Sequence, residues 1–118
     1  MKRTLLTLGA ATILSLAVLI PSHAASDKPL IRQFDAGETR TFTVYLQAGV
    51  TYIIAAVAGN DSMDLDLTLY DDRGRFCTED TAPDADALVV WTPSRSGTFT
   101  FEVENCGAAG LAGIGVEP

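Results

Sequence analysis

The segment from Asn60 to Gly74 alternates apolar and polar side chains with a period of two. The apolar positions are Leu65, Leu67 and Leu69, and the polar positions beside them are Asp64, Asp66 and Thr68. This pattern predicts a β-strand with one buried face and one solvated face. Asp71 to Gly74 then predicts a turn, because a glycine at its end accepts a positive φ.

Comparable short runs recur through the rest of the chain, separated by turns rich in Gly, Pro and Asp. They are found at residues 31–34, 39–46, 50–58, 75–78, 88–92, 98–104 and 111–116. No helical period appears after the first 24 residues. Evenly spaced short strands predict an all-β fold, a single antiparallel β-sandwich of seven or eight strands.

Two of these strands have distinctive patterns. In the segment 50–58 the positions between Tyr52, Ile54 and Ala56 also carry apolar side chains. A strand that is apolar on both faces is expected in the centre of a sheet. The segment 111–116 is rich in glycine and predicts only a weak final strand.

The first 24 residues have the features of a secretory signal peptide. Lys2 and Arg3 precede an apolar run from Leu5 to Ile20, and Ser22-His23-Ala24 supplies small residues for cleavage after Ala24. A membrane anchor is the alternative, but the run is shorter than the about 20 residues that span a bilayer. We therefore expect a periplasmic or secreted protein with a signal peptide (1–24), a lead-in (25–34) and one domain (35–118).

The charge of the chain excludes some partners. The formal net charge is −7, and removing Lys2 and Arg3 leaves six basic residues against fifteen acidic ones, a net charge of −9. Nucleic acids and anionic membranes are bound by Lys and Arg, so neither is expected as a partner. Cations would be attracted to such a surface.

The cysteines predict one disulfide bond. Cys77 and Cys106 form an even pair in a chain that we expect to reach an oxidising compartment. The alternative is two buried free thiols. Their spacing includes no CxxC motif, so a zinc knuckle and a thioredoxin-like site are not expected.

Several short motifs resemble the bacterial pre-peptidase C-terminal (PPC) domain. They are Leu46-Gln47-Ala48-Gly49-Val50-Thr51-Tyr52, Asp64-Leu65-Asp66-Leu67, Leu69-Tyr70-Asp71, Trp91-Thr92-Pro93, Ser96-Gly97-Thr98-Phe99 and Val103-Glu104-Asn105. The resemblance spans about Asp35 to Val116 and implies a jelly-roll-like, non-catalytic sandwich. Such a domain usually follows a secreted protease, and here no protease is attached. The resemblance therefore implies a free-standing exported module.

The residue inventory argues against an enzyme. The only histidine, His23, lies in the segment predicted to be cleaved, so no histidine-based triad or metal site is expected in the mature chain. Lys28 lies in the lead-in, which makes a buried lysine nucleophile unlikely on sequence grounds. Paired carboxylates can hydrolyse glycosides, but they need a cleft that a small single sandwich has little material to build.

The acidic residues suggest a calcium site at one end of the sandwich. Asp61 and Asp64 precede the strand at 65–70, whereas Asp80, Asp84 and Asp86 follow its hairpin partner. In an antiparallel hairpin these two groups lie at the same end, and calcium takes six to eight oxygen ligands from flexible acidic loops. The alternative is a solvated acidic end that keeps the protein soluble.

Three aromatic residues are candidates for ligand binding, namely Tyr45, Tyr70 and Trp91. Exposed aromatic rings stack on sugars or anchor protein partners, although a lone tryptophan in a small sandwich is commonly part of the core. The sequence thus predicts a non-catalytic exported accessory or binding module for a protein or polysaccharide of the cell envelope. The alternative function is a calcium-responsive structural β-sandwich.

Overall fold

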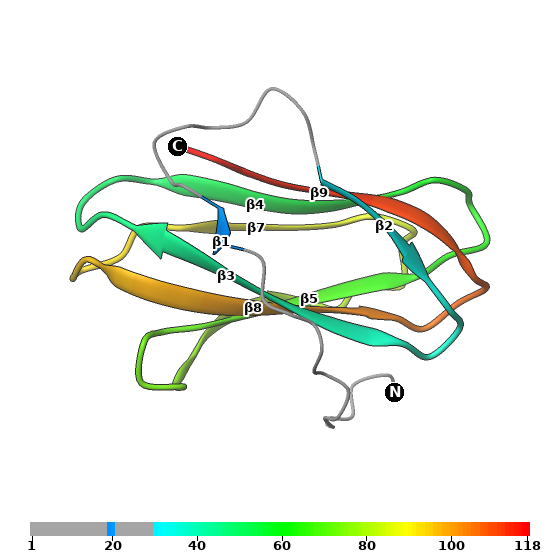
Figure 1. Ribbon diagram of the computed structural model, residues 1–118, viewed down its shortest axis with the longest axis horizontal. Helices are drawn as coiled ribbons and strands as arrows, with labels where there is room; N and C mark the ends of the chain where they lie inside the picture. Colours follow the sequence, from blue (N-terminus) through cyan, green and yellow to red (C-terminus); the bar gives the residue numbers. More distant parts are fainter. Residues whose placement is uncertain (1–18, 21–29) are drawn as a thin grey trace.

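The computed structural model describes residues 19–20 and 30–118, and these form two β-sheets packed face to face (Figure 1). The five-stranded sheet has the order β1-β3-β8-β5-β6, and the four-stranded sheet the order β2-β9-β4-β7. The strands are β1 (Leu19–Ile20), β2 (Leu30–Phe34), β3 (Thr39–Leu46), β4 (Tyr52–Ala58), β5 (Leu65–Tyr70), β6 (Phe76–Asp80), β7 (Ala87–Trp91), β8 (Gly97–Asn105) and β9 (Gly110–Glu117). The described part of the chain contains no helix.

The predicted all-β sandwich is confirmed. Residues 30–118 form eight strands, and every pairing among them is antiparallel. Residues 30–34 of the predicted lead-in supply β2, which is an edge strand of the four-stranded sheet. The predicted signal peptide and its cleavage site lie outside the described residues, apart from Leu19 and Ile20.

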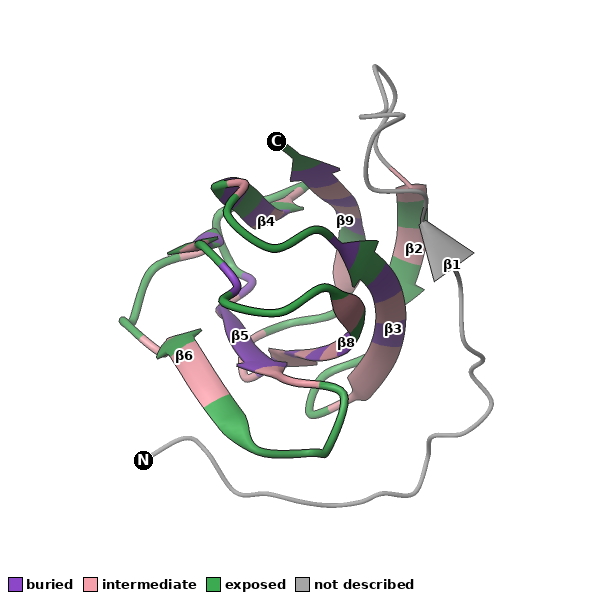
Figure 2. Ribbon diagram, turned by 90° about the vertical axis from the view of Figure 1, so that its left-hand side faces the viewer, coloured by how far each residue is buried: buried purple, intermediate pink, exposed green. Residues whose placement is uncertain are grey.

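Strand β5 has the predicted alternation of apolar and polar side chains, but its polar face is not solvated as predicted, because Asp66 and Thr68 are only 2% and 6% exposed. It lies between β8 and β6, and its three leucines are fully buried. Behind them the core contains a stacked aromatic pair, Phe42 and Phe101, with ring centroids 5.2 Å apart. Figure 2 shows how buried positions alternate with more exposed ones along β3 and β9. The inner faces of both sheets therefore share one core.

The turn between β5 and β6 is built around Asp71. Its Oδ1 accepts hydrogen bonds from the backbone N–H groups of Arg73 and Arg75, each at 2.9 Å. Gly74 has a φ of 77° and donates its N–H to the Asp71 carbonyl at 3.0 Å. The backbone hydrogen bond from Arg75 is the main cause that lowers the pKa of the Asp71 carboxyl. The predicted turn and its glycine are confirmed.

The glycine-rich final strand is longer and more central than its sequence indicated. Strand β9 lies between β2 and β4 and pairs with β4 over six residues. Strand β4 is central, as predicted, because it lies between β9 and β7. Its second apolar face is nevertheless open, with Ile53 and Val57 exposed. No other strand among residues 30–118 packs on that face.

The predicted disulfide between Cys77 and Cys106 is wrong, because both residues are thiols that form no disulfide bond. Cys77 lies in β6 beside the end of β5, whereas Cys106 donates its N–H to the Asp64 carbonyl before the start of β5. The two cysteines therefore lie beside opposite ends of β5, about five residues or about 17 Å apart along that strand. They also lie on different sides of it, because β5 separates β6 from β8. A disulfide requires Cα atoms within about 7 Å of each other.

The free cysteines lead to a first prediction. Protein exported from a bacterial host and unfolded without reductant should react with two equivalents of a thiol reagent per chain, and its melting temperature should not change when reductant is added. In the native state Cys77 should react slowly, because burial raises the pKa of its thiol. A Cys77→Ser, Cys106→Ser double variant, which has no thiol after residue 24, gives the background signal of the thiol reagent. A melting temperature that falls on reduction would show that the exported protein does contain the disulfide.

Candidate functional site

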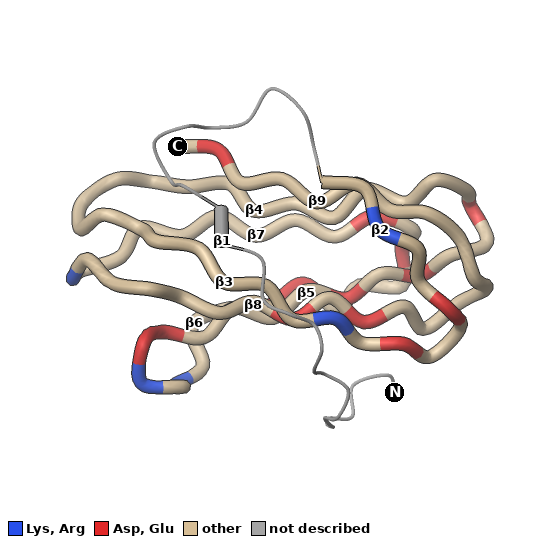
Figure 3. The backbone as a smooth tube through the Cα atoms, viewed as in Figure 1, with Lys and Arg blue, Asp and Glu red and all other residues tan. Residues whose placement is uncertain are grey.

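The two acidic loops meet at one end of the sandwich, as the hairpin argument predicted. The Leu65 N–H donates to the Ala85 carbonyl at 3.1 Å, and the Ala58 N–H donates to Asp86 Oδ1 at 2.8 Å. Figure 3 shows the acidic residues gathered towards this end, with the β5–β6 turn at the opposite end. Asp71 belongs to that opposite turn.

The five predicted calcium ligands are not equivalent. Asp80 accepts hydrogen bonds from the N–H groups of Ala82 and Leu88, at 3.1 Å and 2.9 Å, so its carboxylate shapes the loop. Asp86 accepts the Ala58 N–H described above. Asp61 and Asp84 are exposed, and Asp64 is half-buried. The structure brings their loops together, and a calcium site formed by them stays a prediction.

A different acidic group converges more closely. In the described part of the chain, ligand atoms of Asp66, Glu104 and Cys106 lie within 4.8 Å of one another. Asp66 pairs with Glu104 across β5 and β8, and the Cys106 thiol donates to Asp66 Oδ2 at 3.5 Å. The sequence placed Asp66 on the polar face of its strand. It did not indicate this group, because the group exists only through the pairing of β5 with β8.

Asn105 connects this end of the sandwich to three backbone segments. The side chain is fully buried. Its Oδ1 accepts from the N–H groups of Asp64 and Gly107, at 3.2 Å and 3.1 Å. Its Nδ2 donates to the carbonyls of Asp35 and Ala108, at 3.3 Å and 2.8 Å. One buried amide thus provides hydrogen-bond partners for four backbone groups.

The three predicted aromatic ligands do not form one platform. Tyr45 is 44% exposed on the outer face of the five-stranded sheet, and Tyr70 is half-buried on the same face. They come from β3 and β5, with β8 between them. Trp91 points to the same side of β7 as the buried Ala87 and Val89 and packs against the core. Two of the three residues therefore share a face, and the third is on the other sheet.

The outer face of the four-stranded sheet is almost entirely apolar, and we call it the apolar face. Its outward positions are Ile31, Gln33, Ile53, Ala55, Val57, Leu88, Val90, Leu111, Gly113, Gly115 and Glu117. Six of them are large hydrophobic side chains that are 40% to 54% exposed. Glu117 is the charged residue among them. The apolar alternate positions of the segment 50–58 were the sequence signal for this surface.

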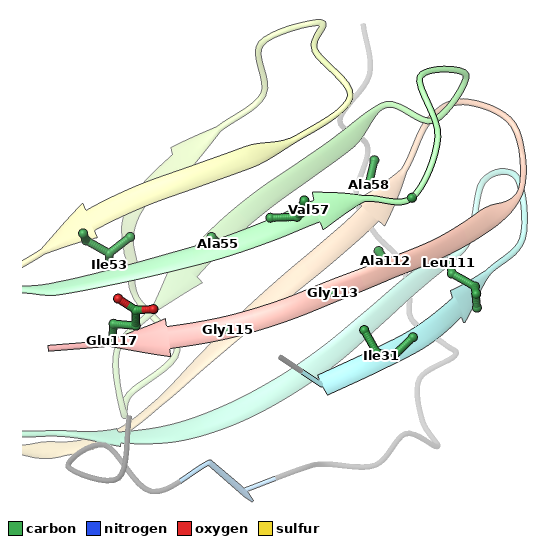
Figure 4. Close-up of a pocket in the computed structure, with 11 residues that line it drawn as sticks. Ile31, Ile53, Ala55, Val57, Ala58, Leu111, Ala112, Gly113, Gly115 and Glu117 are labelled. Atoms are coloured by element: carbon green, nitrogen blue, oxygen red, sulfur yellow. The ribbon is translucent and has the colours of Figure 1, made fainter. Parts of the chain in front are cut away.

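The apolar face contains a groove of about 560 Å³. Gly113 and Gly115 leave β9 without side chains there, while Ile31 projects from β2 and Val57 and Ile53 project from β4 (Figure 4). Register places Gly113 between Ile31 and Val57 in one row across three strands. The floor is therefore backbone, and the walls are branched aliphatic side chains.

These features define a small β-sandwich with one hydroxyl-rich, acidic outer face and one apolar outer face. No model of a known protein family matches the chain, and no curated protein matches it. Among the described residues, no helix is long and apolar enough to cross a membrane. Solved structures, however, match it over most of its length.

Three of these structures are informative about the fold. The pre-peptidase C-terminal domain of a Bacillus anthracis collagenase matches with a TM-score of 0.68 and 13% identity, covering 89% of this chain and 98% of that domain. CorA, a surface-associated copper-binding protein of Methylomicrobium album, matches with a TM-score of 0.64 and 10% identity, covering 86% and 98%. PliG, a periplasmic inhibitor of g-type lysozyme from Aeromonas hydrophila, matches with a TM-score of 0.56 and 13% identity, covering 85% and 95%.

The resemblance to PPC domains that the sequence motifs indicated is thus confirmed as a likeness of fold. At 10% to 13% identity these matches establish the sandwich and its topology. The neighbours are described as a C-terminal domain of a collagenase, a surface-associated copper-binding protein and a lysozyme inhibitor. The same scaffold therefore presents different sites, and the function of this chain has to be argued from its own surfaces.

The environment of Asn105 leads to a second prediction. Asn105→Leu should lower the free energy of unfolding by about 2–4 kcal/mol, because four backbone partners lose their hydrogen bonds in a buried site. Asn60→Ala is the matched control, since Asn60 Oδ1 accepts one exposed hydrogen bond from the Ser62 N–H. Urea denaturation measures both. Equal losses would show that the buried amide has no special part in joining the loops.

Proposed function

We propose that this chain is a non-catalytic exported binding module that acts on a protein or polysaccharide of the cell envelope. The observation that carries the proposal is the outer face of the five-stranded sheet, which we call the tyrosine face. Its outward positions on β3, β5 and β8 are Thr39, Thr41, Thr43, Tyr45, Asp66, Thr68, Tyr70, Thr98, Thr100, Glu102 and Glu104, of which Asp66 and Thr68 are buried.

The tyrosine face has the chemistry of a contact surface. Across the sheet Tyr45 is opposite Thr98, and Tyr70 is opposite Thr100, so each ring has a hydroxyl beside it at the strand spacing. A tyrosine ring offers a flat apolar surface together with a polar hydroxyl. Threonine hydroxyls both donate and accept hydrogen bonds. This combination suits stacking on sugar rings and contact with a protein backbone.

The charge of this face narrows the partner. Glu102 and Glu104 lie on β8 at the end opposite Tyr45, with Asp66 beside Glu104. Anionic polymers would be repelled by these carboxylates. The partner that fits is therefore a neutral polysaccharide or a protein with a basic surface.

Two other observations support an exported, non-catalytic module. The first 24 residues carry a signal-peptide pattern, and the sequence after it contains no histidine. The structural neighbours include a surface-associated protein and a periplasmic inhibitor. A periplasmic or secreted location is accordingly part of the proposal.

Loss of the exposed tyrosine gives a third prediction. Tyr45→Ala should weaken binding of the exported protein by about tenfold or more, the scale of a hot-spot residue, tested separately by co-sedimentation with an insoluble neutral polysaccharide and on immobilised basic envelope proteins. Tyr45→Phe should retain most of the binding if the ring is what stacks. Arg73→Ala, at an exposed position of the β5–β6 turn and outside both faces, is the control. Full binding by a Tyr45→Ala, Tyr70→Ala double variant would refute the proposed surface.

A second candidate function is a calcium-responsive structural sandwich. It is favoured by the contact between Leu65 and Ala85, which holds the two acidic loops side by side. Calcium at 100 times its dissociation constant would add about 2.7 kcal/mol to stability, a rise in melting temperature on the order of 10 °C for a domain of this size.

This gives a fourth prediction. The melting temperature should rise in calcium and fall with chelator, and Asp61→Asn with Asp84→Asn should abolish the difference, because both carboxylates are exposed and able to turn towards an ion. Asp72→Asn, in the turn at the opposite end, is the control. Coincident melts at millimolar calcium would leave the acidic end as a solvated surface.

A further inference from the structure

We propose that the apolar face is a dimer interface, on which two copies of this chain pack sheet to sheet. The inner faces of the two sheets already form a complete core, so the six exposed aliphatic side chains add nothing to the packing of one copy. Each is about half exposed, which amounts to roughly 600 Å² of apolar surface, the upper end for the largest patch on a typical monomer. Such a surface is expected to be covered.

The area matches what a dimer requires. Two copies of a patch of roughly 600 Å² bury about 1,200 Å² in total, which is the lower bound of a stable specific interface. The patch spans all four strands, so it is broad enough for one sheet to rest on another. Sheets packed in this way lie about 10 Å apart with interdigitating side chains.

The relief of the apolar face is self-complementary. Strands β4 and β7 form a ridge, in which Ile53 is opposite Val90 and Ala55 is opposite Leu88. Strand β9 beside them forms the trough of Gly113 and Gly115. A two-fold axis that lies in the interface plane, parallel to the strands and between β9 and β4, places the ridge of each copy against the trough of the other, as an isologous interface demands. Glycine inside a strand is typical of sites where another chain approaches closely.

The charge distribution is compatible with this partner. Glu117 is the charged residue of the apolar face and lies at the end of β9, where it can stay at the rim. Among the described residues, the other acidic side chains lie in the loops and on the five-stranded sheet. Two copies of the exported chain, each with six basic and fifteen acidic residues and a net charge of −9, repel one another at long range, so added salt should tighten the dimer. A basic partner on this face would show the opposite salt dependence.

The proposed dimer leaves the tyrosine faces free. In a sheet-to-sheet dimer through the four-stranded sheets, the five-stranded sheets point outward on opposite sides. The assembly would thus be bivalent, which raises the avidity for a repetitive envelope partner without any new contact. The dimer itself requires nothing of that partner and stands apart from the proposed function.

The fifth prediction concerns the mass of the exported protein, measured by sedimentation equilibrium between about 1 and about 200 µM, a range that brackets micromolar affinity. We expect a monomer–dimer equilibrium that shifts towards dimer with added NaCl. Val57→Asp and Leu88→Asp should each raise the dissociation constant by about tenfold or more, because each buries a charge in an apolar interface. Phe76→Asp is the matched control, since Phe76 is exposed on β6, away from the apolar face.

A variant that fills the trough distinguishes a specific dimer from non-specific hydrophobic association. A Cβ at Gly115 meets no atom within 4 Å, so Gly115→Val should be accommodated in the folded monomer while filling the trough. The proposal expects this more hydrophobic variant to dimerise at least tenfold more weakly. Circular dichroism and a thermal melt establish that each variant is folded.

Three outcomes would overturn the dimer. A wild-type chain that stays monomeric throughout the range leaves the face to another occupant, such as a partner protein or an apolar ligand. Association that Gly115→Val strengthens would be non-specific. A dimer weakened by Phe76→Asp or Tyr45→Ala, and not by Val57→Asp, would lie on the other sheet. A wild-type chain that dimerises as expected but binds no envelope partner would refute the proposed function and leave the dimer standing.

Discussion

The pairing of β5 with β8 is the contact on which the rest of this structure depends. It places the three buried leucines of β5 beside Phe101 and Val103 of β8 and so forms the centre of one half of the core. The same register sets Leu65 opposite Asn105, whose buried amide joins the loops at the acidic end. On the outside, it sets Tyr70 opposite Thr100 on the tyrosine face. The register between β5 and β8 therefore determines the core, the closure of the loops and the candidate surface together.

The outer faces of the two sheets differ in polarity, although the strands of both sheets alternate inward and outward side chains. The outward positions of the five-stranded sheet carry hydroxyls, carboxylates and two tyrosines, the polar composition expected of an antiparallel sheet, although Asp66 and Thr68 on its β5 strand are buried. The outward positions of β4 and β7 carry Ile53, Val57, Leu88 and Val90. That difference lies in the side chains alone, so it reflects what each surface contacts rather than what the fold requires.

Much of the fold could be predicted from the sequence, because period-two alternation and turn residues are local signals. The strand at 65–70, the turn at Asp71 and the central position of β4 follow from them. Strand β9 was underestimated, since Gly113 and Gly115 remove the outward side chains by which alternation is recognised. The Cys77–Cys106 bond was predicted from the even number of cysteines and the expected oxidising compartment. Neither contains information about strand order, and β5 separates the two cysteines. The Asp66 group needed the register between β5 and β8, which no local pattern supplies.

The glycines of β9 offer a last physical argument about the apolar face. A glycine inside a strand costs roughly 0.5–1 kcal/mol relative to alanine and contributes no packing. Gly115 is not in a conformation that needs glycine, and a side chain there would meet no neighbour within 4 Å. Neither backbone geometry nor crowding within one copy of the chain accounts for it. What a side chain at this position would obstruct is the approach of another surface to the groove, and a ridge of the shape found on β4 and β7 is the surface that such a groove accepts.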